Sequence, residues 1–131
     1  MAITDRHGLP IAVGIESGQR HEARLVDQTL ESCFFDEVPE TLIGDRAYDS
    51  RPLRESLARE RGVRLVAPAR RNTRQKPDGR RLRRYRRRWL VERLFSWLQN
   101  FRRLNVRWEH KAENFLGFVH LGCLRILLRR L

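Results

Sequence analysis

The stretch that decides the fold is residues 41–68, which read TLIGDRAYDSRPLRESLARERGVRLVAP. Its apolar run at 41–44 predicts a short buried strand that leads directly into a charged residue. Asp49 or Ser50 can cap the helix that follows, whose two leucines lie four residues apart and which ends at Gly62. The β-branched run at 63–67, closed by a proline, predicts a second strand. The stretch therefore predicts a strand–helix–strand unit, which is typical of α/β proteins.

Before this unit, two short apolar runs at 2–4 and 9–15 flank the sequence DRHG at 5–8. Asp and Gly favour tight turns, so these runs predict a β-hairpin. Residues 21–30 carry apolar side chains at near-helical spacing and predict a helix. The order strand, strand, helix, strand, helix, strand predicts an α/β fold with a mixed sheet and flanking helices.

The carboxyl-terminal half has a different organisation. The Arg-rich segment at 68–82 has almost no apolar residues and predicts a basic loop. A long amphipathic helix is expected from 83 to 101. A second helix, at 112–130, is apolar on nearly every side, so we expect it to be buried in a core or an interface. We treat residues 1–131 as one domain, with 1–67 forming the sheet and two helices, 68–82 the loop, and 83–131 the carboxyl-terminal helices.

Charge divides the chain into two parts. Its 131 residues carry 28 Lys and Arg against 16 Asp and Glu, a formal net charge of +12. Residues 1–62 hold eight basic and twelve acidic residues, whereas residues 63–131 hold 20 basic and four acidic ones. Nearly all the positive charge is arginine, which forms bidentate contacts with phosphate. The second part therefore predicts a polyanionic partner.

Disulfide, zinc and membrane proteins are not indicated. Cys33 and Cys123 have no C-x-x-C pairing and no histidine at zinc-ligand spacing, so we expect two reduced, buried thiols. The longest apolar stretch, 115–128, is interrupted by His120 and Arg125 and is too short to span a membrane. We therefore expect no membrane partner.

The helix expected at 83–101 has one polar and one apolar side. At about 100° per residue, one stripe holds Tyr85, Arg88, Glu92 and Gln99, and the opposite stripe holds Leu90, Leu94, Leu98 and Phe101. Any amphipathic helix shows such a division. Glu92 is different, because it is the only acidic residue between Arg80 and Arg107 and a solvated face has no need of it. Its carboxylate is a candidate metal ligand.

Asp45 directly follows the strand predicted at 41–44. Sheets of α/β proteins place ligand-binding groups at the carboxyl ends of their strands. A carboxylate from a strand end and one from a helix can share a metal site. Such a site activates a water or a DNA 3′-hydroxyl on one ion and stabilises the leaving oxygen on the other. Asp45 and Glu92 are therefore the candidate catalytic and metal-binding residues.

Two strings of residues resemble a known family. They are IGDRAYDS at 43–50, followed by Leu53 and Arg54, and RYRRRWLVERLFSWL at 84–98. The likeness continues through NFRRL at 100–104 and RWE at 107–109. These strings resemble the second and third motifs of bacterial insertion-sequence DDE transposases, most closely the insertion-sequence-five group. Two long motifs in the right order make the resemblance specific, and it covers nearly the whole chain.

The resemblance implies a ribonuclease H-like mixed sheet with flanking helices and a reaction that depends on Mg²⁺ or Mn²⁺, with two ions in a complete site. Asp45 matches the second catalytic acid of the family and Glu92 the third. The family's first catalytic Asp lies on a central strand upstream of the region that begins here. The resemblance thus implies a catalytic domain truncated at its amino terminus, with its first strand missing. Asp5 could replace the family's first catalytic Asp by residue type alone, but its Asp-x-x-Gly context favours a structural role in a turn.

Charge and resemblance together indicate a DNA-contact surface. The expected contacts are Tyr85, Arg86, Arg87, Arg88, Gln99, Arg102, Arg103 and Trp108. Gln99 occupies the Lys position of the family's Tyr, Arg, Glu, Lys signature, and Arg102 or Arg103, one turn further on, can substitute for it. The dense arginines at 80–88 repel one another unless a polyanion is near. Trp108 can stack on an unpaired base or pack against its neighbours.

Two functions follow from these observations. In the first, the chain is part of a metal-dependent transposase that cleaves and joins DNA strands at insertion-sequence ends, with the missing strand supplied by an upstream reading frame. Its expected partners are DNA, both insertion-sequence ends and target, and an upstream reading-frame product or a homo-oligomer. In the second, it is a catalytically inactive DNA-binding transposase remnant. A basic RNA-binding protein of the ribosomal kind would explain the charge of the second half but not the acidic first half. Either function is expected in the bacterial cytoplasm, associated with the nucleoid.

Overall fold

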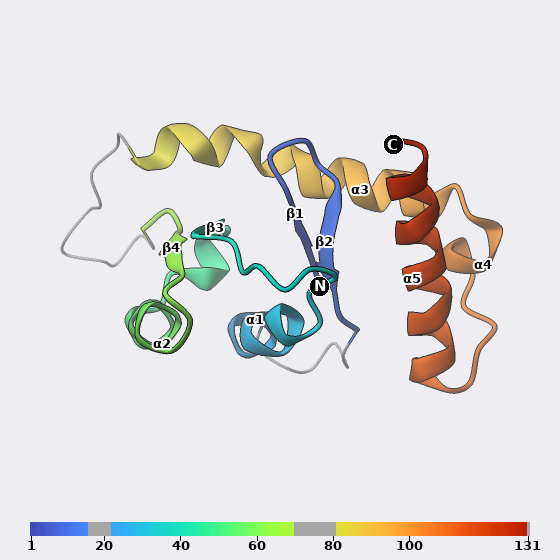
Figure 1. The fold of residues 1–131 in the computed structure, drawn as a ribbon, viewed down its shortest axis with the longest axis horizontal. Helices are drawn as coiled ribbons and strands as arrows, with labels where there is room; N and C mark the ends of the chain where they lie inside the picture. The colour runs from blue at the N-terminus through green and yellow to red at the C-terminus, as the bar shows by residue number, and fades with distance from the viewer. Residues whose placement is uncertain (16–21, 70–80, 131) are drawn as a thin grey trace.

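The computed structural model describes residues 1–15, 22–69 and 81–130, apart from the side chains of 22–24 and 81–84. Its elements are β1 (Ala2–Thr4), β2 (Pro10–Val13), α1 (Glu22–Glu31), β3 (Thr41–Ile43), η1 (Arg46–Tyr48), α2 (Arg51–Arg61), β4 (Arg64–Val66), η2 (Arg81–Arg88), α3 (Trp89–Gln99), α4 (Arg102–Asn105) and α5 (Ala112–Leu128), where η marks a 3₁₀-helix. This is the predicted α/β order, with a helical second half (Figure 1). The basic loop predicted at 68–82 falls mostly outside the described residues.

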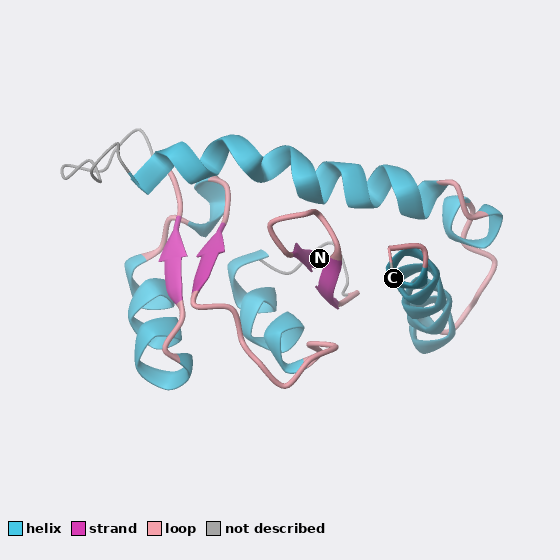
Figure 2. Cartoon of the chain, turned by 45° about the horizontal axis from the view of Figure 1, so that its top comes forward, coloured by secondary structure: helices cyan, strands magenta, loops and turns pink. Residues whose placement is uncertain are grey.

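The strands form two separate pairs instead of the single mixed sheet that the sequence predicted. β1 pairs antiparallel with β2, and β3 pairs parallel with β4. Within the described residues, no backbone pairing joins β1 to β3. The long helical run of η2 and α3 extends along both pairs, with η2 against β3 and β4, and α3 against β1 (Figure 2). The helices, and not a continuous sheet, therefore set the positions of the two pairs.

The predicted hairpin turn is formed by the carboxylate of Asp5. Its Oδ1 accepts hydrogen bonds from the backbone N–H groups of His7 and Leu9, both at 2.8 Å. Gly8 has a φ of 81°, a conformation that L side chains rarely adopt. The guanidinium of Arg93 on α3 donates to the carbonyl oxygen of His7 and so fastens the turn to the helix.

Helix α2 has the ends that the sequence predicted. Ser50, one of the two candidate caps, accepts a hydrogen bond from the N–H of Leu53 through its side chain. The other candidate, Asp49, forms an ion pair with Arg54 instead. At the carboxyl end Gly62 adopts a left-handed φ of 66°.

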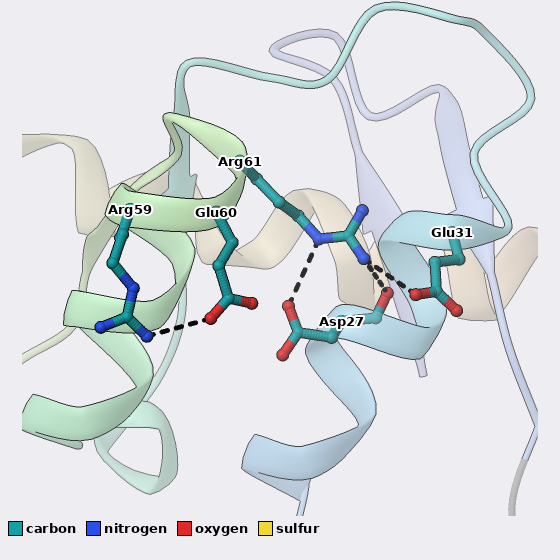
Figure 3. A network of polar contacts seen from close by, with 5 residues as sticks. All are labelled: Asp27, Glu31, Arg59, Glu60 and Arg61. Atoms are coloured by element: carbon teal, nitrogen blue, oxygen red, sulfur yellow. Dashed lines mark hydrogen bonds and ion pairs between the residues drawn. The ribbon is translucent and has the colours of Figure 1, made fainter.

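Arg61, in the last turn of α2, joins this helix to α1 (Figure 3). Its Nε lies 3.4 Å from a carboxylate oxygen of Asp27, and its terminal nitrogen lies 3.0 Å from Glu31. The Arg61 side chain is only 23 % exposed, so these contacts are partly shielded from solvent. These ion pairs link the two helices.

Two apolar clusters form the core, and strand β2 belongs to both. The first cluster joins the hairpin to α1, α2 and β4 and contains Ile3, Ala12, Val26, Leu30, Leu53, Leu57, Val63 and Leu65. The second joins β2 to α3 and α5 and contains Val13, Leu94, Leu98, Val119, Cys123 and Ile126. Neighbouring strand residues point to opposite faces, so Ala12 and Val13 enter different clusters. Strand β2 therefore connects the two halves of the molecule.

Both cysteines are free thiols, and the burial that the sequence predicted for both holds for Cys123 only. Cys123 is buried in the second cluster, and burial raises its pKa to about 11. Cys33 is only half-buried, beside β2, where its backbone bridges to Ala12.

The segment expected to be one α-helix from 83 to 101 has two conformations. Residues 81–88 form the 3₁₀-helix η2, and regular α-helix begins only at Trp89. A 3₁₀-helix rises further per residue than an α-helix, which increases the axial spacing of successive arginines. It also aligns residues three apart, and the guanidinium of Arg88 lies 5.9 Å from the centroid of the Tyr85 ring. The prediction of a helical segment is confirmed, but its first six residues, 83–88, are not α-helical.

Of the two settings predicted for α5, a core or an interface, the described residues show the core, and only one face of the helix enters it. Val119, Cys123 and Ile126 lie in the second cluster. On other faces, Leu121 is 60 % exposed and Leu124 is 51 % exposed. The neighbouring elements cover one side of the helix, and its remaining leucines contact solvent. None of the described helices is long and apolar enough to cross a membrane.

Replacing either of two glycines by alanine should change the free energy of unfolding, in opposite directions. Gly62→Ala should lower the free energy of unfolding by about 1 kcal/mol, because the left-handed conformation strains a Cβ atom. Gly117 lies inside α5, and apart from its chain neighbours and the helix's own backbone no described atom lies within 4 Å of a Cβ atom placed there. Gly117→Ala should therefore raise the free energy of unfolding by about 0.5–1 kcal/mol. Urea unfolding followed by circular dichroism measures both changes. A loss of stability in both variants would contradict the assigned conformations.

Candidate functional site

Asp45 lies at a tight turn directly after β3. Its Oδ1 accepts a hydrogen bond of 2.7 Å from the N–H of Ala47 and so caps η1. Gly44 makes the turn feasible, because a Cβ atom there would lie 2.8 Å from the ring of Tyr48. The local sequence therefore fixes the backbone that carries the Asp45 carboxylate at the carboxyl end of a strand, where it was predicted.

Glu92 lies in the first turn of α3, one helical turn after Arg88. Its Oε1 is 3.0 Å from a guanidinium nitrogen of Arg88, and the two side chains are 60 % and 46 % exposed. An exposed pair at this spacing contributes only about 0.3–0.5 kcal/mol, so a stronger ligand can replace Arg88 as the partner of Glu92 at little cost.

Asp45 and Glu92, 47 positions apart in the sequence, line the same groove. The groove has a volume of about 970 Å³. Strands β1 and β3, with the residues that follow them, contribute to its walls, and η2, α3, α1 and β4 also add residues to its lining. Arg87 and Arg88 also line it and give this region positive charge. In the described part of the chain, no three His, Cys, Asp or Glu side chains are close enough together to hold a metal ion.

Asp5 also lines this groove, at the end of β1. One of its carboxylate oxygens already accepts two backbone hydrogen bonds in the hairpin turn. The turn role predicted for Asp5 is confirmed. The groove is thus lined by two carboxylates with predicted chemical roles and one with a structural role.

Both strands that border the groove have an open edge. Met1 and Gly14 exchange backbone hydrogen bonds of 2.7 and 3.0 Å, so in this antiparallel pair the N–H and C=O of Ala2 point away from β2. Ala2 lines the groove, and within the described residues β1 has no second partner strand. Hydrophobic patterning did not indicate this open edge, because pairing partners are set by three-dimensional position.

Among the described strands, β3 likewise pairs on one side only, with β4. Glu40 and Gly44 form backbone hydrogen bonds of 2.9 and 3.0 Å with β4. Backbone groups alternate in direction along a strand, so those of Thr41 and Ile43 point away from β4. Both residues line the groove. Two sets of backbone donors and acceptors therefore border the space that Asp45 also lines.

The predicted DNA-contact residues are not brought together at one place. Tyr85 is half-buried on η2, where Arg86, Arg87 and Arg88 are exposed. Gln99 is exposed at the end of α3, beyond the groove. These residues therefore lie along the η2–α3 run at different distances from Glu92.

The remaining predicted contacts lie past the end of α3. Arg102 and Arg103 are exposed on α4 and line a second pocket, of about 690 Å³. Trp108 is 70 % exposed, so its ring is not packed into the core. Sequence reasoning missed the arginines that α5 and the residues after it contribute to this pocket, because the apolar composition of residues 112–130 predicted burial in a core or an interface. Their spacing at 125, 129 and 130 was the available signal.

Comparison with known proteins shows what the chain is similar to. The profile of the family described as Transposase DDE domain matches residues 1–127. A protein of Burkholderia cepacia assigned as a transposase for insertion sequence element IS402 is 41% identical over 85 residues, which are 65% of this chain and 37% of that protein. A Brucella ovis protein assigned as a transposase for insertion sequence element IS6501 is 30% identical over 129 residues, covering 98% of this chain and 95% of that protein. No solved structure matches the chain significantly.

The exposed arginines of η2 predict a salt-dependent affinity for duplex DNA. Each phosphate contact contributes about 0.9 to the slope of log affinity against log salt, so Arg86→Gln with Arg87→Gln should reduce the slope by about two. Arg51→Gln with Arg59→Gln removes the same charge from exposed positions on α2 and should leave the slope unchanged. Fluorescence anisotropy with a labelled duplex gives both slopes. Equal slopes for the two double variants would show that η2 does not contact the DNA phosphates.

Proposed function

Because the chain belongs to the DDE-domain transposase family, we propose that it forms part of the catalytic centre of a transposase that cleaves and joins DNA at insertion-sequence ends. One observation supports this most strongly: Asp45 and Glu92, on elements distant in sequence, line one groove. The match with the Burkholderia relative spans little more than a third of that protein, so the complete protein's activity belongs to the proposal. The motif strings favour the insertion-sequence-five group and a ribonuclease H-like sheet.

Asp45 and Glu92 are the residues that would bind the metal ions. Carboxylate oxygens are the ligands that Mg²⁺ and Mn²⁺ prefer. The hydrogen bond of Asp45 to Ala47 and the ion pair of Glu92 with Arg88 each engage one carboxylate oxygen, so the second oxygen of each side chain can bind an ion. When bound, two such ions supply an activated water or 3′-hydroxyl and stabilise the leaving oxygen. Arg88, beside Glu92, would be in place to contact a DNA phosphate with its remaining N–H donors.

A third carboxylate is expected from an extended segment outside these 131 residues. Ala2 lies on one side of the groove and Thr41 and Ile43 on the other, and their outward backbone groups pair with none of the described strands. Burying such groups without partners is unfavourable, whereas a strand between the two edges would pair with both. A strand in that place would unite the two pairs into one sheet and pass beside Asp45. An upstream reading-frame product or an upstream part of a longer chain would supply it.

The second candidate function is an inactive DNA-binding remnant, and the partners of the two carboxylates favour it. Asp45 caps η1 and Glu92 pairs with Arg88, so both residues contribute to local structure without any metal. The DNA immediately upstream of Met1 distinguishes the two functions. Coding sequence for an apolar strand with an Asp supports the enzyme, and its absence in all frames supports the remnant.

In a protein that includes the upstream segment, Asp45→Asn and Glu92→Gln should each lower strand transfer at least about a hundredfold. Each change removes a metal-binding charge and keeps the side-chain volume, so affinity for duplex DNA should change little. Asp36→Asn and Glu113→Gln are the matched controls, because both acids are exposed and outside the groove. Strand transfer is measured with labelled insertion-sequence ends and Mg²⁺. Activity of either groove variant near that of its control would refute the assignment.

Ile43→Pro tests the open edge of β3. It removes an N–H group that points into the groove and is not used by β4, and proline is tolerated at such edge positions. The variant should therefore destabilise the protein that includes the upstream segment, where this N–H is paired, more than the 131-residue chain. Leu42→Pro removes an N–H directed at β4 and should destabilise both. Thermal unfolding gives the change in melting temperature for each of the two variants in each of the two proteins. An equal effect of Ile43→Pro on both proteins would argue against a strand in the groove.

A further inference from the structure

The pocket beyond the end of α3 is separate from the groove that holds Asp45 and Glu92. Its volume of about 690 Å³ is in the range of sites for small molecules and single nucleotides, and is too small for a duplex. It lies between the end of α3, α4 and one face of α5. Gly122 brings α5 close to α4 there, because a Cβ atom would lie 3.1 Å from Leu104. The packing of the two helices therefore shapes the pocket.

The pocket is strongly basic. Arginines from α4, α5 and the residues after α5 line it, and they are Arg102, Arg103, Arg125, Arg129 and Arg130. Among the described residues that line it, none is Asp or Glu. Within the residues that the structure describes, only Arg103 of these five arginines forms an ion pair, with Glu109 at 3.3 Å. Several guanidinium groups are therefore available to an anion from outside the chain.

Aromatic rings line the same pocket, each beside one of these arginines. Guanidinium carbons lie 5.3 Å from the Phe118 centroid for Arg103, 5.7 Å from Phe101 for Arg125, and 5.5 Å from Trp97 for Arg130. Cation–π contact holds each guanidinium over a ring and leaves its N–H donors free for phosphate. Leu104 and Ile126 add apolar surface to the lining. The pocket thus combines phosphate donors with surface that a planar base can cover.

We infer that this pocket binds unpaired nucleotides of single-stranded DNA. Phosphate alone would explain the arginines but not the rings, and an acidic peptide would leave the rings without planar partners. Bases stack on aromatic and guanidinium planes whatever their sequence, and the adjoining phosphates meet the basic rim. The inference rests on the proposed function for the choice of DNA, but it requires neither metal nor the carboxylates of the groove.

The test measures binding of the 131-residue chain to fluorescein-labelled oligothymidine of eight nucleotides, with EDTA present, and to a duplex of sixteen base pairs. Arg125→Gln with Arg130→Gln should weaken oligothymidine binding about tenfold or more and duplex binding less than about threefold. It should also lower the single-strand salt slope by about 1.4, at about 0.7 for each phosphate contact. Arg51→Gln with Arg59→Gln removes equal charge from α2 and should change neither affinity.

Phe118→Leu provides a second test that does not alter charge. It keeps an apolar side chain but removes the ring, so oligothymidine affinity should fall about fivefold or more with an unchanged salt slope. Circular dichroism confirms that each variant is folded. Equal losses for single strand and duplex, unchanged affinity in Phe118→Leu, or equally strong competition by polyglutamate would each overturn the inference. Because no metal is present, loss of strand transfer in groove variants has no bearing on this result.

Discussion

Burial of one leucine stripe on α3 determines the position of every candidate site. Leu94 is completely buried, and Leu90 and Leu98 are nearly so. The stripe packs against the hairpin on one side and α5 on the other, so the opposite side of α3 turns Glu92 towards solvent. Arg93, on the same helix, donates to the carbonyl of His7 and fixes the hairpin. The groove lies along this helix, and the basic pocket lies at its carboxyl end.

The sequence predicted those elements whose ends are determined locally. Asp5 makes its turn with neighbouring N–H groups, and Ser50 and Gly62 end α2 through contacts within a few residues. Asp45 and Glu92 were also identified, because a strand end and an isolated acid among arginines are visible in the sequence. Their common groove is consistent with that interpretation, although their catalytic roles and the insertion-sequence-five grouping stay predictions.

The features that depend on distant contacts were not predicted. Whether β1 and β3 join one sheet depends on what lies between them, which hydrophobic patterning does not reveal. The periodicity of α5 indicated burial, yet it did not reveal that only one face, with Val119, Cys123 and Ile126, packs into the described core. Apolar and basic residues on that helix then define a pocket with α4 that no single segment contains. The change from 3₁₀- to α-helix at Trp89 was not predicted either, because apolar spacing alone does not distinguish the two kinds of helix.

The central claim is that Asp45 and Glu92 face one groove and bind the same divalent ion, and paramagnetic broadening tests it most directly. Small amounts of Mn²⁺ are added to the isotopically labelled 131-residue chain, and the backbone amide signals are followed by NMR. Two carboxylates hold the ion weakly, but broadening requires only proximity. The account predicts that the amide signals near Asp45 and those near Glu92 broaden together at the same Mn²⁺ concentration. It also predicts that Asp45→Asn reduces the broadening of both sets of signals. Broadening near one residue alone, or first at the exposed acids Asp36 and Glu37, would contradict it.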